Sequence, residues 1–212
     1  MKNIKDEYSK YINIFIGIHI VLIYFLIFGF NIDELKKLYK DELYKCIILS
    51  VLPIIGIVLN GFLPNSIKEF LVFWKFKNRL PGNEAFSKYA LKDQRVDINI
   101  LKSKYEVIKS NNFDENKLWY KIYKKYEKCP SVWESQKNYL FTRDMIGITV
   151  LFFIITALVD VLIKNANFDI IYFFLIFIFE YLILKISSKN YAIKFVTNVL
   201  AEDSAKTQER KL

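Results

Sequence analysis

The stretch MIGITVLFFIITALVDVLI, residues 145–163, contains one ionisable side chain, Asp160, in an otherwise uncharged apolar run. Residues 12–30, 46–63 and 170–184 form three further runs in which apolar side chains predominate. A helix needs about 20 consecutive apolar residues to cross a hydrocarbon core that is about 30 Å thick. Three of the runs are close to this length and the fourth is near the short limit. The sequence therefore predicts an integral membrane protein with four spans.

The distribution of apolar residues also predicts the fold class. They make up 53% of the 212 residues and are concentrated in the four runs rather than spread along amphipathic faces. Runs that are apolar on every side indicate burial in lipid. The sequence shows no alternation typical of strands. We therefore expect an all-α fold, an integral membrane four-helix bundle with a small helical cytosolic insert between the second and third spans.

The predicted spans divide the chain into four parts. Residues 1–64 are expected to form one transmembrane hairpin and residues 65–143 the basic helical insert. Residues 144–200 are expected to form a second hairpin with a helical cytosolic extension, followed by a disordered tail at residues 201–212.

The distribution of charge predicts the topology. Residues 65–143 contain 17 Lys and Arg against 9 Asp and Glu, whereas residues 31–45 contain 4 of each kind. Basic residues stay on the cytosolic side by the positive-inside rule. Both termini and the insert are therefore expected in the cytosol. A basic cytosolic face also suits an anionic leaflet, at about 1 kcal/mol per Lys or Arg near the surface.

Local signals predict where the helices of the insert begin and end. Capping boxes at residues 66–69 and 131–134 each predict a helix start. The first helix is expected to run to Arg79, before a turn at residues 80–83, and the second to continue unbroken into the third span. Three shorter helices are expected at residues 84–91, 97–110 and 114–128, with Asp97 as an N-cap. The fourth span has no stop signal after Lys185 and is expected to extend to Leu200.

The second predicted span carries residues that alter helix geometry. Pro53 removes a backbone donor and is expected to kink the helix near the bilayer centre, either for packing alone or as a hinge or pore feature. Gly56, Asn60 and Gly61 are expected to let another helix approach closely.

Three ionisable residues lie inside the predicted spans, where an unpaired charge is costly. Asp160 is near the outer end of its span and can reach the interface. His19 and Glu180 are each expected about 7–11 Å inside the cytosolic boundary, so a hydrogen bond between spans one and four is predicted. This contact either fixes packing or lines an ion or proton path. The remaining alternative is no contact, with Glu180 protonated or paired with Lys185.

Several charged and aromatic residues of the insert are candidates for ligand or partner binding. Arg95 and Asp97 belong to a compact charged loop between helices. Trp119, Tyr123 and Lys124 belong to a helix whose interleaved aromatic and basic residues suit either base stacking or, more commonly, a core-facing aromatic side. Residues Arg143 and Asp144, at the entry of the third span, could couple the insert to the bundle through a salt bridge or act as an interfacial anchor.

The sequence contains no strong signal for catalysis or metal binding. It lacks G-x-S-x-G, H-E-x-x-H, C-x-x-C and a glycine-rich phosphate loop. One histidine and two widely spaced cysteines make a zinc site unexpected, and Cys46 and Cys129 are predicted on opposite sides of the membrane. We therefore expect no catalytic residues, no metal, no cofactor and no binding of duplex DNA.

The insert resembles that of uncharacterised bacterial membrane proteins with four spans. The resemblance covers roughly the middle third of the chain and rests on the segments LPGNEAF (80–86), DQRVD (93–97), LWY (118–120) and YLFTRD (139–144). It implies a multi-pass protein of the bacterial cytoplasmic (inner) membrane and attaches no activity. In architecture alone, the chain is similar to membrane-depolarising effectors of bacterial anti-phage defence.

Three functions are compatible with these features. The favoured hypothesis is a non-enzymatic, oligomeric, channel-like membrane protein whose insert senses a nucleotide signal or a cytosolic partner protein and whose spans permeabilise or remodel the bilayer. The alternatives are a membrane anchor or scaffold that recruits a cytosolic enzyme, and a lipid-modifying enzyme that uses the ionisable residues of the spans.

Overall fold

The computed structural model describes residues 3–28, 51, 54–109, 114–162 and 170–209, and within these ranges every element is helical and no strand forms. The chain divides into two compact units. The first, here called the apolar unit, comprises Met1–Lys68 and Phe141–Lys185. The second, here called the basic unit, comprises Glu69–Leu140 and Ile186–Leu212. The C-terminal part of the chain thus belongs with the insert rather than forming a separate tail.

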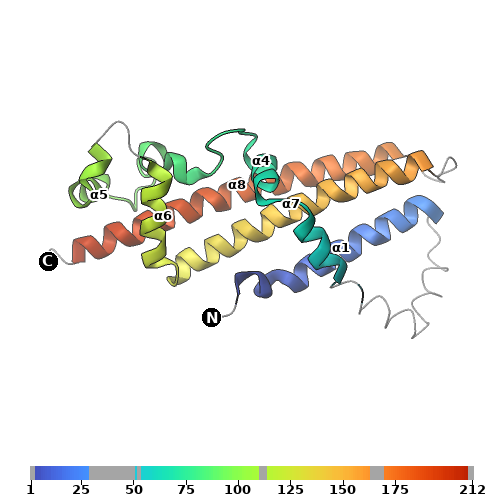
Figure 1. The fold of residues 1–212 in the computed structure, drawn as a ribbon, viewed down its shortest axis with the longest axis horizontal. Helices are drawn as coiled ribbons and strands as arrows, with labels where there is room; N and C mark the ends of the chain where they lie inside the picture. The colour runs from blue at the N-terminus through green and yellow to red at the C-terminus, as the bar shows by residue number, and fades with distance from the viewer. Residues whose placement is uncertain (1–2, 29–50, 52–53, 110–113, 163–169, 210–212) are drawn as a thin grey trace. The chain divides into compact units, whose positions relative to one another are not determined.

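Three helices are long and apolar enough to cross a membrane: α1 (Ile4–Phe28), α7 (Pro130–Leu162) and α8 (Ile170–Glu209) (Figure 1). A fourth candidate is the pair Ile54–Phe62 and α4 (Asn65–Phe73), which is bent by 71°. The described residues therefore contain three candidate spans, or four if the bent pair forms one span.

The helices of the apolar unit expose apolar side chains in a way that suits lipid. Only 22% of the most apolar 18-residue window of α1 is buried in the structure, and only 17% of the corresponding window of α8. These shares are far too small for a core helix of a water-soluble protein. An exposed apolar surface of this extent indicates a membrane environment. Its members include Ile14, Ile18, Ile57, Phe62, Leu158, Val161, Leu175, Ile178 and Phe179.

The basic unit has a conventional core. It contains the 3₁₀ segment η1 (Pro81–Glu84), the π-helical segment η2 (Ala85–Tyr89), α5 (Ile98–Lys104), the 3₁₀ segment η3 (Glu106–Lys109) and α6 (Glu115–Tyr126). These elements pack with the ends of α7 and α8 that belong to this unit. The buried core includes Phe86, Leu101, Trp119, Ile122, Tyr123, Val132, Tyr139, Val196, Val199 and Leu200.

One predicted N-cap is confirmed, and a second N-cap lies at a predicted helix start. The Asp97 carboxylate accepts hydrogen bonds from the amides of Asn99 and Ile100 and opens α5. The Asp114 carboxylate accepts from the Lys117 amide and opens α6. Such caps depend on residues two or three positions apart, and for this reason local sequence predicts them well.

Four predicted boundaries are wrong. Helix α4 begins at Asn65, one residue before the predicted capping box, and ends at Phe73, where Trp74 adopts a φ of 52° that a right-handed helix cannot continue. The helix expected at 97–110 breaks at Tyr105 and resumes as a 3₁₀ turn. Helix α7 begins at Pro130, since proline is favoured in the first helical turn, so Ser131 is not its cap.

The expectation of a disordered tail at residues 201–212 is also wrong. Helix α8 continues to Glu209, well beyond Leu200. Asp203 is fully buried and its Oδ1 lies 2.7 Å from Lys104 Nζ, while the hydroxyl of Ser204 accepts a hydrogen bond from the amide of Asp97. These contacts with distant residues stabilise a segment whose polar composition suggested disorder. Pro53, Cys46 and the loop at residues 31–43 lie outside the described residues.

Candidate functional site: buried charges at a helix break

The apolar unit contains a cluster of buried polar side chains where the bent helix pair breaks. The helix Ile54–Phe62 ends before Pro64, whose carbonyl accepts hydrogen bonds from the amides of Ile67 and Lys68. The first half-helix therefore ends with backbone carbonyls that have no intrahelical partner. At membrane depth such irregular backbone is tolerated only where protein or a water-filled cavity satisfies it.

The side chain of Lys68 provides hydrogen bonds to the helix end at this break. Its ammonium donates to the backbone carbonyl of Asn60 at 2.6 Å, to the side-chain oxygen of Asn60 at 2.5 Å and to Asp144 Oδ1 at 3.1 Å. These are three acceptors for the three donors that an ammonium carries. A cation at the C-terminus of a helix is also stabilised by the helix dipole. Lys68 thus links the two half-helices and caps the first one.

Asp144 is the anion of the cluster and is fully buried. Its Oδ1 accepts from Lys68 and, at 3.1 Å, from Arg143 Nη2. Its Oδ2 accepts from Asn60 Nδ2 at 3.2 Å and from the Tyr8 hydroxyl at 3.0 Å. Four donors match the four lone-pair positions of a carboxylate. We call these five residues the Asp144 cluster; it joins α1, both half-helices and α7.

Glycine provides the space for this cluster. A Cβ atom at Gly147 would lie 3.3 Å from Lys68 Cε, tighter than most side-chain contacts allow. At Gly56, an added Cβ would collide with the side-chain oxygen of Asn13 on α1, so the predicted close helix approach at Gly56 is present. No atom lies within 4 Å of the corresponding position at Gly61, so the expectation of a close approach there is wrong among the described residues.

The charge balance makes the cluster energetically demanding. Lys68, Arg143 and Asp144 carry two positive charges and one negative charge, and each is at most 5% exposed. Burying charges costs several kcal/mol per ion unless good geometry and additional hydrogen bonds compensate. Ionisable groups that apolar helices retain despite this cost often mark functional positions.

A second polar contact joins α1 and α8. His19 Nε2 lies 3.4 Å from Glu180 Oε1, so the predicted contact between these residues is present. The separation is longer than a hydrogen bond, and Nε2 has no hydrogen-bond partner among the described residues. His19 Nδ1 lies 2.8 Å from the Phe15 carbonyl, and Thr149 Oγ1 lies 2.7 Å from Glu180 Oε1. A carbonyl only accepts, so Nδ1 is the donor in the contact with Phe15.

The surroundings of this contact are aromatic. The His19 ring packs against the rings of Phe15, Phe152 and Phe177, at centroid distances of 4.4, 4.9 and 5.4 Å. His19 is 1% exposed, whereas the Glu180 side chain is 24% exposed. Asp160 is partly exposed near the end of α7 and makes no hydrogen bond or ion pair with another described residue.

The candidate binding residues of the basic unit are mostly occupied by contacts within the fold. Asp97 caps α5. Trp119 and Tyr123 are 7% and 8% exposed and stack on each other at 5.7 Å, which favours the core interpretation of this aromatic side. Lys124 is exposed and pairs with Glu127 at 2.9 Å. None of these residues offers a free aromatic face to a base.

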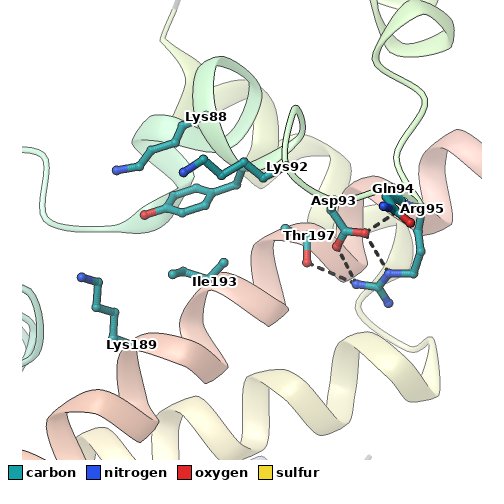
Figure 2. A pocket seen from close by; sticks show the side chains of 9 residues that line it. Lys88, Lys92, Asp93, Gln94, Arg95, Lys189, Ile193 and Thr197 are labelled. Atoms are coloured by element: carbon teal, nitrogen blue, oxygen red, sulfur yellow. Dashed lines mark hydrogen bonds and ion pairs between the residues drawn. The ribbon is translucent and has the colours of Figure 1, made fainter.

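Arg95 has a different environment, at the wall of a pocket of about 640 Å³ (Figure 2). Its guanidinium pairs with Asp93 at 2.7 Å and donates to Asn198 Oδ1 at 3.0 Å. The Arg95 hydrogen bonds lower the pKa of Asp93 to about 2, so this carboxylate is ionised at neutral pH. Lysines from η2, from the following loop and from α8 also line the pocket.

Sequence reasoning identified Asn60, Arg143 and Asp144 but missed Lys68 and Tyr8. Lys68 stands among mixed aromatic and basic residues, a pattern that favours a helix in the headgroup zone, and Tyr8 precedes the first predicted span. The available signal was Asp144 itself, because a carboxylate beside an apolar run requires a cationic partner. Its partners lie 76 and 136 positions away in the chain, and spacing does not identify them.

Within the described residues, no group of three or more His, Cys, Asp and Glu side chains is arranged to hold a metal ion. The chain matches no protein-family model, and neither a curated protein nor a solved structure shows significant similarity to it.

Proposed function

We propose that this chain is a non-enzymatic, oligomeric membrane protein whose basic unit receives a signal and whose apolar helices respond by permeabilising or remodelling the bilayer. The observation that carries the proposal is the Asp144 cluster at the break of the bent helix pair. Broken helices in transport proteins place polar groups and half-helix ends at the position where ions pass or bind. Ionised side chains are costly inside apolar helices, and their retention at this break supports a functional role.

In this proposal the Asp144 cluster holds the closed state. Lys68 satisfies the end of one half-helix, and Asp144 holds Lys68 in place. Opening the bundle would separate these charges and admit water, which then solvates them. The signal must supply the free energy of separation, and this cost keeps the closed state populated without it.

The topology belongs to the same proposal. Both termini and the basic unit face the cytosol of a bacterial cell, and the candidate spans lie in the cytoplasmic membrane. Helices α7 and α8 each contribute residues to both units, so a change in the basic unit can reach the bilayer along a continuous backbone. Reporter fusions after Lys102 and Leu212 should read cytosolic, and an external reading at Lys102 would contradict this orientation.

Membrane potential is the direct test. The protein is expressed in cells that carry a voltage-sensitive dye, as wild type and as Lys68→Met. Wild type should depolarise cells only when its signal is present, whereas Lys68→Met, which leaves the half-helix end unsatisfied, should depolarise them without it. Lys117→Met, an exposed lysine of α6, is the matched control and should behave as wild type.

Two other outcomes would replace the proposal. If neither wild type nor Lys68→Met changes the potential, and the protein retains a cytosolic enzyme at the membrane, it is a scaffold. If the purified protein instead alters a lipid and the Glu180→Gln variant lacks this activity, the protein is a lipid-modifying enzyme.

A further inference from the structure

The pocket of the basic unit lies between η2 with its following loop and one face of α8 (Figure 2). Lys88 comes from η2, Lys92 and Arg95 from the loop, and Lys189 from α8. The tertiary fold therefore brings together cations that are up to 101 positions apart in the chain; residues 88 and 189 set this separation. Four cationic side chains line the pocket and Asp93 is the one lining carboxylate.

Arg95 and Asp93 neutralise each other. Two hydrogen bonds at 2.7 and 3.0 Å join the guanidinium to the carboxylate, and further contacts to Asn198 and Thr197 hold it against α8. Figure 2 shows Arg95 turned toward Asp93, on the side of the pocket opposite Lys189. This pair forms a polar wall, and the net positive charge of the pocket comes from the three lysines.

The three lysines are only partly compensated. Lys88 forms an ion pair with Glu84 at 2.7 Å, and the same carboxylate also forms an ion pair with Lys75 at 2.6 Å. The side-chain ammonium groups of Lys92 and Lys189 form no ion pair or hydrogen bond with any described residue. Figure 2 shows the amino groups of Lys88, Lys92 and Lys189 on the same side of the pocket.

Like charges gathered in one pocket repel each other, and an anion bound between them relieves this repulsion. Lysine ammonium groups serve as point charges for phosphate in many binding sites. A single carboxylate would neutralise one lysine, whereas a phosphate group with two negative charges can accept hydrogen bonds from all three. We propose that this pocket binds a phosphate-bearing anion through Lys88, Lys92 and Lys189.

The phosphate can come from a soluble molecule or from a lipid headgroup. Lys189 follows the apolar run 170–184 on the same helix by five positions, or about 7.5 Å at 1.5 Å per residue, which is within reach of headgroups. A pocket of about 640 Å³ also accommodates a nucleotide-sized ligand. The inference rests on the proposed function, because it names the chemistry of the signal that the basic unit receives.

Binding is measured separately from permeability, with full-length protein in nanodiscs of phosphatidylcholine. The first arm titrates inorganic pyrophosphate and ATP by calorimetry at about 0.15 M salt, where long-range attraction is screened. The second arm measures binding to phosphatidylcholine vesicles that contain phosphatidylinositol 4-phosphate, relative to phosphatidylcholine alone. Saturable binding in the first arm identifies a soluble anion, and binding confined to the second identifies a headgroup.

Substitutions then locate the site. The double variant Lys92→Gln with Lys189→Gln should lower the affinity of whichever probe binds by at least about tenfold, which is the effect expected from losing even one charged hydrogen bond. The matched control, Lys117→Gln with Lys121→Gln on α6, removes the same charge outside the pocket and should keep the wild-type affinity. Lys92→Arg with Lys189→Arg should retain most of the binding.

The inference is overturned if no probe binds in either arm, or if the control loses as much affinity as the pocket variant. Its failure is distinguishable from failure of the proposed function. If wild type and the pocket variant depolarise cells equally, the phosphate site is rejected as the receiver of the signal and the proposed function stands. If a probe binds specifically at the pocket but the membrane potential never changes, the phosphate site is supported and the permeabilising function is rejected.

Discussion

The replacement of Asp144 by asparagine should be one of the most destabilising single changes in the apolar unit. Asparagine nearly preserves the volume, but it removes the negative charge and replaces one acceptor oxygen by a donor. Lys68, 2% exposed, and Arg143, 5% exposed, then lose the carboxylate to which both donate. Breaking a buried ion pair in this way costs about 3–5 kcal/mol.

The pairing itself is measured with a double-mutant cycle. Lys68→Met keeps much of the apolar stem and removes the ammonium, which leaves Asp144 with Arg143, Tyr8 and Asn60. The double variant lacks both charges and should be more stable than the sum of the single losses predicts, by at least about 2 kcal/mol, because no uncompensated Lys68 charge remains. Equilibrium unfolding of the purified protein in a detergent mixture, followed by circular dichroism, provides the free energies.

The matched control is Asp160→Asn, the same chemical change on the same helix at a partly exposed position. It should cost no more than about 0.5 kcal/mol, as is usual for exposed substitutions. The reasoning is refuted if Asp144→Asn costs no more than this control. It is also refuted if the losses from Lys68→Met and Asp144→Asn are additive, because additive losses would mean that the two side chains do not stabilise each other.

Three further predictions concern other parts of the chain. His19→Ala and Glu180→Ala should each lower the yield of folded protein, by about 1–3 kcal/mol of stability, and the double variant should be no worse than the worse single; additive losses would exclude the pairing. Tyr139→Pro should insert in the membrane but fail to depolarise cells, because proline interrupts α7 at a cost of about 3 kcal/mol or more, whereas Tyr139→Ala, which removes the ring and keeps the helix, should still respond to the signal. Glu84, whose pKa is lowered to about 2 by hydrogen bonds from two lysines, contributes stability that is present above its ordinary pKa of 4.5 and is lost as the pH falls toward 2; Glu84→Gln should therefore flatten the unfolding profile in that window, and an unchanged profile would contradict the role of this ion pair.

Much of the secondary structure follows from local sequence. The three long helices α1, α7 and α8 are predicted because uninterrupted apolar runs satisfy their backbone only as helices in lipid. The cap at Asp97 is predicted because a carboxylate reaches amides two or three positions ahead, and the cap at Asp114 follows the same rule. The contact of His19 with Glu180 is predicted because both side chains are at a similar depth and a buried ionisable group requires a partner.

The tertiary structure alone decided which distant residues meet. Lys68 has the sequence environment of a headgroup lysine, and only the bend between the two half-helices brings it to Asn60 and Asp144. Likewise, Asp203 lies in a segment whose composition suggests disorder, and burial against Lys104 keeps that segment helical. Helix formation depends on neighbours a few positions apart, whereas the pairing of buried charges depends on which helices pack together. For this reason the sequence by itself determined an all-helical membrane protein, and only the packing of its helices determined where its buried charges are neutralised.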